Sequence, residues 1–358
     1  MRHILLNPGP VSLSEGVRRA AAAVDLCHRE PEYFDLQDRV LEALRRVYSL
    51  PENEWRAVTL AGSGTSALEA MFTSLLPDGA RLLVLENGVY GERLSRLADI
   101  HGIEREGLRH EWTQAWDLER VTAMLADGSF THVAAVQHET TTGRLNPVQP
   151  LAALCHEYGA CLLLDAVSSF GAEAIPFDSP ALTACAATAN KCLHGIPGVC
   201  LVLMRSETLD FHPRPVRSLT LDLALWADHQ QRRSTPFTPP VNSLMALDCA
   251  LNELEGAGGW RARHARYLRL ANRVASASSA LGVDPFLPAE ESSCVLRAYT
   301  LPAGLDYAAV HDGLKRHGFV VYAGQGGLAE RMFRISTMGD INDYDLERLL
   351  AALADVFG

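Results

Sequence analysis

The sequence has no excess of positive charge, no paired cysteine motif and no apolar run long enough to cross a membrane. Asp and Glu number 43 against 32 Lys and Arg, which gives a formal net charge of −11. This balance argues against nucleic acid or an anionic membrane surface as the main partner, because both would repel the chain. An acidic protein can still bind an acidic small molecule where arginines are concentrated locally.

The eight cysteines form no Cys-x-x-Cys pair and show no spacing typical of metal ligands. Most lie in apolar runs, such as Cys161 in ACLLLDA and Cys200 in GVCLVLM. This indicates reduced, buried thiols and predicts no metal site. The N-terminus MRHILLNPGPV lacks the apolar core of a signal peptide. We therefore expect a soluble, cytoplasmic protein with no membrane partner.

The chain of 358 residues is long enough to bury a large core, and its composition is ordinary for a globular enzyme. Predicted strands and helices alternate from Ala57 to Met204, which favours a mostly parallel sheet with helical crossovers. Glycines at 256–259 interrupt the pattern, and from Ser292 it changes to an α+β unit. We expect an N-terminal segment at the active site (1–15), a large domain (16–255) and a small C-terminal domain (256–358).

An acid and a lysine in the middle of the chain suit pyridoxal phosphate (PLP). Asp165 ends the apolar run LLLD, where open α/β sheets place ligand chemistry, and Lys191 ends the next apolar segment. The lysine amine can form a Schiff base with the aldehyde, and the carboxylate can keep the pyridine nitrogen protonated. The alternative is a helix-capping acid and a surface lysine, and this spacing alone does not exclude it.

Two stretches before this pair favour a flat, anionic ligand. A strand at 57–61 leads into Ser63, Gly64 and Thr65 and then a helix, so free N–H groups and the helix dipole can face a phosphate. Tyr90 lies between glycines at a strand-to-helix junction, where its ring can stack on a planar group. An ordinary tight turn and a packed tyrosine are the alternatives.

Other polar groups follow strand ends or interrupt apolar runs. Thr140, Thr141 and Thr142 follow a strand and can donate to a cofactor oxygen. Arg334 lies within the apolar strand FRIS, and a buried arginine needs an anion, either a structural acid or a substrate. The rigid turn at Pro8 and Gly9 suits the edge of a pocket, although a plain entry loop is the alternative.

Together, GSGT, NGVYG, HETTTG, LLLDAVSS and ANK resemble the class V, fold type I PLP-dependent aminotransferases in order and spacing. The resemblance covers essentially the whole chain and implies a large domain with a mostly parallel seven-stranded sheet flanked by helices, plus a smaller C-terminal α+β domain. Further stretches, including DLCHREPEY, HETTTGRLNP, ANKCLHGIPG and FRISTMGDI, resemble the branch that moves the amino group of 2-aminoethylphosphonate to pyruvate. The products would be phosphonoacetaldehyde and L-alanine.

The resemblance implies a role for each matching residue. Lys191 would form the Schiff base and move the proton, and Asp165 would pair with the pyridine nitrogen. Arg334 would bind the carboxylate of pyruvate or alanine. The other implied cofactor contacts are Ser63, Gly64, Thr65 and Asn190 at the phosphate, Tyr90 on the ring, and Thr140 or Thr141 near the ring hydroxyl.

The resemblance also implies a homodimer with shared active sites, in which Thr238 reaches the phosphate held by the neighbouring subunit. The phosphonate contact is not implied in the same way, and Arg29 is the candidate because its loop is specific to the branch. Relatives often have an aromatic residue at the position of Thr65 or Thr235, and here both are threonine. The details of the phosphate contacts are therefore open.

Three other functions stay open at this point. Alanine– and serine–glyoxylate transaminases share the PLP motifs but usually differ in the flanking stretches. A PLP-dependent lyase on an aminophosphonate or on cysteine is a second alternative, although Cys294 heads an apolar strand and not a mobile loop. A non-catalytic binding protein is the third, and the presence of both Lys191 and Asp165 argues against it.

Overall fold

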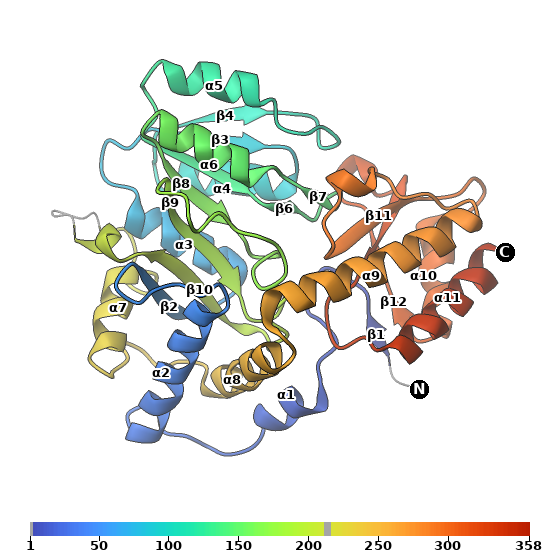
Figure 1. The fold of residues 1–358 in the computed structure, drawn as a ribbon, viewed down its shortest axis with the longest axis horizontal. Coiled ribbons are helices and arrows are strands. Elements are labelled where there is room, and N and C mark those ends of the chain that lie inside the picture. The colour runs from blue at the N-terminus through green and yellow to red at the C-terminus, as the bar shows by residue number, and fades with distance from the viewer. Residues whose placement is uncertain (1–2, 211–215) are drawn as a thin grey trace.

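The computed structural model describes residues 3–210 and 216–358, which form two parts side by side (Figure 1). One part is built on a seven-stranded sheet and the other on a three-stranded sheet near the C-terminus. The first two residues of the predicted N-terminal segment lie outside the described residues. Within the two described ranges, no helix has the length and apolar character needed to cross a membrane.

The large sheet is mixed, and most neighbouring strands in it are parallel. Its members are β2 (Trp55–Gly62), β3 (Leu82–Glu86), β4 (Arg105–Arg109), β5 (His132–Val136), β8 (Cys161–Asp165), β9 (Leu182–Thr188) and β10 (Gly198–Arg205). The strand order is β2-β10-β9-β8-β5-β3-β4, and only β10 runs antiparallel to its neighbours. The predicted seven-stranded, mostly parallel sheet is confirmed.

Helices cover both faces of this sheet. They are α2 (Pro31–Arg46), α3 (Gly64–Leu75), α4 (Val89–Ile100), α5 (Leu118–Ala126), α6 (Val148–Glu157), α7 (Leu223–Gln231) and α8 (Val241–Gly256), while α1 (Glu15–Ala20) packs on α8. Along β3, Leu83 and Leu85 pack into the core shared with α2, α5, α6 and α8, while Leu82 and Val84 pack into the core shared with α3, α4 and α7. A sheet buried on both faces explains why its strands read as continuous apolar runs.

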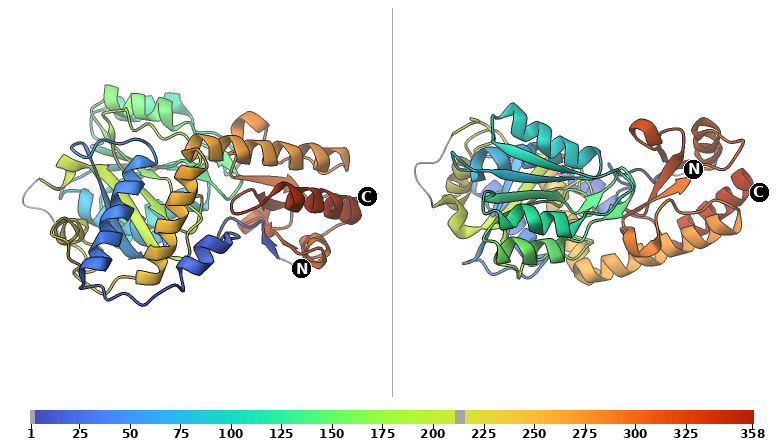
Figure 2. Two further views of the ribbon diagram at one scale, coloured as in Figure 1. Left: turned by 60° about the horizontal axis from the view of Figure 1, so that its bottom comes forward. Right: turned by 90° about the horizontal axis from the view of Figure 1, so that it is seen from above.

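The C-terminal part is an α+β unit. Its members are β11 (Leu296–Thr300), β12 (Phe319–Val320), β13 (Tyr322–Ala323), β14 (Met332–Ser336), α9 (Gly259–Ala280), α10 (Tyr307–Arg316) and α11 (Asp343–Phe357). The three-stranded sheet has the order β11-β14-β13. Helix α9 runs from the large part along the C-terminal part (Figure 2). Short 3-10 helices lie at Ser206–Leu209, Ala289–Glu291 and Gly326–Leu328.

The run FVVYA contributes to two strands and is divided at Val321, which is fully buried. Strand β12 pairs in parallel with β1 (Ile4–Leu5), and β13 pairs with β14. The N-terminal segment is therefore bound to the C-terminal part, where the Leu6 carbonyl also accepts the Ser336 N–H at 2.7 Å. Both marked chain ends lie on this side of the molecule (Figure 1).

A small hairpin of β6 (His138–Glu139) and β7 (Arg144–Leu145) reaches from the large part to the C-terminal part. The Gly143 carbonyl accepts the Ser293 N–H at 2.9 Å, and Arg144 forms an ion pair with Glu291 at 2.6 Å. The hairpin follows β5 directly. It therefore connects the strand ends of the large sheet with the three-stranded sheet.

A second junction forms around buried Glu173. Its Oε1 accepts the Ser293 hydroxyl at 2.5 Å and the Cys294 N–H at 3.0 Å, and its Oε2 lies 3.2 Å from His264 Nδ1 on α9. The His264 Nδ1 atom also lies 2.9 Å from the Ala172 carbonyl oxygen, so His264 extends this polar network. These hydrogen bonds join the large part, α9 and the segment that leads into β11.

Candidate active site

Asp165 and Lys191 are placed by adjacent strands of the large sheet. Asp165 is the last residue of β8, and Lys191 follows the end of β9, which lies next to β8. The Asp165 side chain is 3% exposed, and its Oδ1 accepts the Val167 N–H at 2.9 Å. The fold therefore brings the predicted acid and lysine to the same edge of the sheet, as parallel strands require.

The N-terminal segment closes over Lys191. Its Nζ donates a hydrogen bond to the Pro8 carbonyl. A Cβ atom on Gly9 would lie 2.6 Å from Lys191 Cδ and 2.8 Å from Nζ, and Gly9 has φ +111°, so only glycine fits there. Pro8 and Gly9 thus contact the predicted catalytic lysine from the far end of the sequence. The only other lysine of the sequence, Lys315, is exposed in the last turn of α10.

Burial dominates the acid–base properties of this pair. It raises the pKa of Asp165 to about 6, against the opposing effect of the Val167 N–H and of the Arg93 and Lys191 charges. Burial also lowers the pKa of Lys191 to about 8, and the charges of Arg334 and Arg93 act in the same direction. A lysine with this pKa is partly neutral near pH 7, as a nucleophile and proton carrier must be.

Ser63, Gly64 and Thr65 lie at the N-terminus of α3, as their sequence predicts. Ser63 is the N-cap, and its N–H donates to the Ser66 hydroxyl at 3.2 Å. The Thr65 hydroxyl accepts a hydrogen bond from Arg93 at 3.1 Å. The first turn of a 12-residue helix presents N–H groups and a positive dipole end, which suit a phosphate.

Tyr90 lies in the first turn of α4. The hairpin binds this turn through Glu139, a residue that was given no role from the sequence. Glu139 is fully buried, and its Oε2 accepts the Tyr90 and Gly91 N–H groups, each at 3.2 Å. The helix begins after Gly88, where a Cβ atom would lie 2.2 Å from the Glu139 Cδ atom. Gly88, two residues before Tyr90, therefore makes room for this carboxylate, and Gly91 makes room for the backbone of β3.

The three hydroxyls after β5 have different partners. Thr141 Oγ1 donates to Glu139 Oε1 at 2.5 Å and accepts the Val89 N–H at 3.1 Å. Thr142 Oγ1 is buried and has no partner among the described residues. The Thr141 proton is therefore committed to Glu139, which leaves Thr140 as the better candidate of the predicted pair for a ring hydroxyl.

Every hydrogen bond to the Glu139 carboxylate is donated to it, since the Thr141 N–H also points at Oε1 at 3.2 Å. This geometry favours the ionised form. Burial acts against it and raises the pKa of Glu139 to about 7. Three of these four donors are backbone N–H groups, which cannot accept a proton from the carboxyl and therefore stabilise its ionised form.

Arg334 is 3% exposed and extends from β14 towards the hairpin. Its Nε donates to the Ala323 carbonyl at 2.9 Å, and its Nη1 donates to the Thr140 carbonyl at 2.7 Å and to Gln325 Oε1 at 3.4 Å. No acid among the described residues forms an ion pair with it. The structure thus contains a buried guanidinium held by neutral oxygens, next to the predicted cofactor residues, which is a suitable site for a substrate carboxylate.

The remaining predicted residues are not all brought into one place. Asn190 Oδ1 accepts the Thr188 hydroxyl at 2.8 Å beside Lys191. Thr238 is exposed, and so is Arg29, which lies in the turn before α2. Within the described residues, neither is hydrogen-bonded to Lys191 or its neighbours. Thr235 lies three residues before Thr238, and its buried hydroxyl has no hydrogen-bond partner among the described residues.

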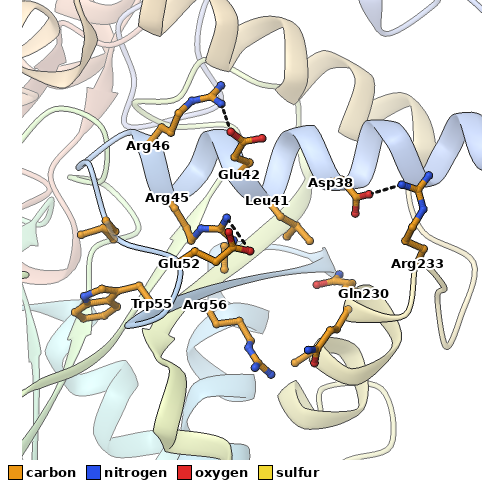
Figure 3. Close-up of a pocket in the computed structure, with 14 residues that line it drawn as sticks. Asp38, Leu41, Glu42, Arg45, Arg46, Glu52, Trp55, Arg56, Gln230 and Arg233 are labelled. Carbon is orange, nitrogen blue, oxygen red and sulfur yellow. Dashed lines mark hydrogen bonds and ion pairs between the residues drawn. The ribbon is translucent and has the colours of Figure 1, made fainter.

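A cleft of about 710 Å³ lies elsewhere, between α2, the start of β2 and α7 (Figure 3). Its charged side chains are largely paired, as Arg45 is with Glu52, Arg46 with Glu42 and Arg233 with Asp38. None of the residues predicted for the site lines it. We therefore assign the chemistry to the strand ends around Lys191 and not to this cleft.

This fold and this site define a class of protein, and the comparisons agree with it. Residues 40–326 match the family model of class-V aminotransferases. The chain belongs to this family. The sequence-based recognition of the class V family is confirmed.

Curated relatives are similar over nearly the whole chain. A 2-aminoethylphosphonate–pyruvate transaminase of Vibrio vulnificus is 34% identical over 359 aligned residues, covering 98% of this chain and 96% of that protein. One of Aeromonas hydrophila is 36% identical, covering 98% and 94%. Among solved structures, an alanine–glyoxylate aminotransferase of Nostoc sp. has a TM-score of 0.92 at 26% identity, covering 100% of this chain and 96% of that one.

Proposed function

We propose that this chain is a PLP-dependent transaminase that moves the amino group of 2-aminoethylphosphonate to pyruvate. The observation that carries the proposal is the buried Arg334 guanidinium, which has no acidic partner among the described residues and lies against the segment that follows β5. An amino-group donor and a keto-acid acceptor that both carry an acidic group would supply the missing anion. The names of the full-length relatives support this choice of substrates.

The residues around Lys191 fit PLP. Gly9 has no side chain, and Lys191 occupies the space that its Cβ atom would fill. The N-terminus of α3 presents backbone N–H groups, and Asp165 supplies a buried carboxylate. When bound, PLP supplies an aldehyde that takes up the substrate amine and a ring that accepts electrons from the adjacent carbon. The residues proposed to hold it are Ser63, Gly64, Thr65, Tyr90, Thr140, Asp165, Asn190 and Lys191.

Lys191 then has two tasks. Its neutral amine, favoured by the pKa of about 8, would bond to the cofactor aldehyde in the resting protein. The Nζ, once freed by the substrate amine, would take a proton from the substrate carbon that bears the amine. With a pKa of about 6, Asp165 is mostly ionised at neutral pH and would hold a proton on the pyridine nitrogen.

Arg334 orients the carboxylate of pyruvate and of L-alanine. A carboxylate of pyruvate would accept hydrogen bonds from the guanidinium, whose other donors are already fixed by the Ala323 and Thr140 carbonyls. In the first half-reaction, 2-aminoethylphosphonate would give up its amine to the bound cofactor, take an oxygen from water and depart as phosphonoacetaldehyde. In the second, pyruvate would take that amine, lose its keto oxygen as water and depart as L-alanine.

We also propose a homodimer with shared active sites. Thr238 and Arg29 are exposed, and within the described residues neither is hydrogen-bonded to Lys191 or its neighbours, which fits their presentation to the site of a second copy. In this arrangement Thr238 would contact the cofactor phosphate of the neighbouring subunit, and Arg29 would be a candidate for the phosphonate. Sedimentation should then give twice the chain mass of 39.0 kDa.

The test is a single half-reaction. Protein loaded with PLP is mixed with 2-aminoethylphosphonate alone, and the visible absorbance of the cofactor is followed together with the products. We expect one equivalent of phosphonoacetaldehyde per site, and then one equivalent of L-alanine on adding pyruvate. A protein that responds to L-alanine or serine with glyoxylate, but not to the phosphonate, would be a glyoxylate transaminase instead.

A lyase is separated by the same assay, because it would release ammonia or sulfide without a keto acid. Against a cysteine desulfurase, Cys294 is only 2% exposed and its N–H is bound to Glu173. Burial also raises the pKa of the Cys294 thiol. A buried thiol of this kind is not a mobile nucleophile.

A further inference from the structure

Arg93 is a cation with no acidic partner, and it touches two of the residues proposed to hold the cofactor. Its Nη1 donates to Thr65 Oγ1 at 3.1 Å, and its guanidinium carbon lies 4.5 Å from the centroid of the Tyr90 ring. No ion pair among the described residues includes it. Arg105 and Arg109, on the neighbouring β4, are in contrast paired with Asp99 and Glu86.

The position of Arg93 is fixed by the same contacts that fix Tyr90. The first three N–H groups of α4 are bound by the hairpin, Val89 to the Thr141 hydroxyl and the next two to the Glu139 carboxylate. Residues three apart lie on the same face of a helix. Arg93, three residues after Tyr90, is therefore directed to the same side of α4.

The charge of Arg93 acts on both central groups of the site. Burial raises the pKa of Asp165, and the charge of Arg93 opposes this larger effect by lowering it. Burial lowers the pKa of Lys191, and the charge of Arg93 lowers it further. A half-buried cation so placed favours an anion in the same space. Two anions are available in the proposed reaction, the cofactor phosphate and the acidic group of the substrate.

The contact with Thr65 decides between them. Thr65 belongs to the first turn of α3, whose N–H groups and dipole suit a phosphate, whereas the substrate arginine Arg334 is held on the hairpin and β13 side. We propose that Arg93 binds the phosphate of the cofactor together with the α3 N-terminus, and so makes the chain select PLP over unphosphorylated pyridoxal. This inference rests on the proposed PLP-dependent function.

The test compares the dissociation constants of PLP and pyridoxal for cofactor-free protein, measured by absorbance titration. Arg93→Met keeps the aliphatic bulk and removes the charge, and Arg96→Met is the matched control, because Arg96 is exposed on the same helix. A lost charged hydrogen bond corresponds to roughly a tenfold to hundredfold change. We expect Arg93→Met to weaken PLP binding to this extent and to change pyridoxal binding less than about twofold, while Arg96→Met changes neither.

Arg93→Lys keeps the charge and should recover part of the preference for PLP, which guards against a variant that simply folds poorly. Equal weakening of PLP and pyridoxal would overturn the inference, because it would show that Arg93 only supports the Tyr90 ring. Unchanged PLP binding with a raised KM for 2-aminoethylphosphonate would also overturn it and assign Arg93 to the substrate. If the unaltered protein binds neither PLP nor pyridoxal, the proposed function itself fails.

Discussion

At the scale of single residues, the groups needed for chemistry are the ones that burial disfavours most. The pKa of Asp165 rises from its ordinary 3.8 to about 6 on folding, so between these values the folded chain binds more protons than the unfolded one. Stability contributed by this group therefore falls as the pH rises through that window. The ionised carboxylate that would serve the cofactor is a cost to the cofactor-free protein at neutral pH.

Asp165→Asn should separate stability from activity. Without cofactor, the variant is expected to be more stable than the unaltered protein above about pH 6, by a few kcal/mol at about 1.4 kcal/mol per pKa unit. Turnover should fall by orders of magnitude, as it should for Asp165→Ala, because the pyridine proton is no longer held. Urea unfolding of both proteins below and above the window measures the first effect. Equal pH dependence in the two proteins would contradict the buried, titrating carboxyl.

Lys191 should capture the cofactor at a lower pH than an ordinary lysine. Only the neutral amine reacts, so the capture rate is expected to rise with pH and level off just above about 8, not near 10.5. Because the sequence has only two lysines, Lys315→Arg leaves a single lysine, and mass spectrometry of peptides after borohydride reduction separates labelled Lys191 from the labelled amino terminus. A rate still rising steeply at pH 10 would contradict the lowered pKa.

At the scale of secondary-structure elements, the start of α4 depends on one carboxylate. Both oxygens of Glu139 accept N–H groups, so in Glu139→Gln the amide nitrogen would face at least one N–H donor whichever way it is turned. The expected loss in the free energy of unfolding is about 1–3 kcal/mol. We expect a lower melting temperature and also weaker PLP binding with altered circular dichroism of the bound cofactor, because Tyr90 and Arg93 move. Asp117→Ala is the control, since it removes the one oxygen that accepts two N–H groups at the start of α5. It should affect stability alone.

The N-terminal segment should be tested at Gly9. Gly9→Ala would combine backbone strain at φ +111° with a clash against Lys191, whereas Gly79→Ala places the same kind of strain, at φ +79°, in open space. Both variants should lose about 1 kcal/mol of stability or more. Only Gly9→Ala should also slow the labelling of Lys191 by PLP and borohydride. Equal labelling in the two variants would show that the segment does not constrain the lysine.

The elements that the sequence predicted well are those with a strong pattern. Strands buried on both faces, such as β8 and β9, read as apolar runs, and the motif residues fell at their ends. Strand β4 was missed because REGLR is short and charged and lies at the edge of the sheet. Glu139 and Arg93 received no role because their partners are distant in sequence, although the three-residue spacing of Tyr90 and Arg93 was a usable signal.

At the scale of the whole molecule, the two parts are joined by polar contacts that titrate. The Glu173 pKa is lowered by the hydrogen bonds from His264, Ser293 and Cys294, which outweigh burial, and the His264 pKa is raised by its hydrogen bond with Glu173. The Glu173 contribution is lost as the pH falls below its ordinary 4.5. The His264 contribution is present below its ordinary 6.5 and is lost as the pH rises through its raised folded value.

His264→Ala should therefore destabilise the protein more at mildly acidic pH than at alkaline pH. The expected difference is modest, because the His264 side chain is 37% exposed and solvent screens the pair. Thermal melting of the variant and the unaltered protein across this range measures it. His311→Ala is a control, because His311 pairs with the neighbouring Asp312 within α10 and not across the junction. A pH-independent loss would mean that His264 contributes packing and not charge.

The two lysines also differ in a way that matters for handling the protein. Lys191 is partly buried and hydrogen-bonded to the N-terminal segment, while Lys315 is exposed at the end of α10, in the C-terminal part. An amine-reactive resin would therefore attach folded molecules through Lys315 or through the amino terminus of the chain, and spare the reactive site. Immobilised in this way, the protein would present the large sheet and its strand ends to the solution in a consistent orientation.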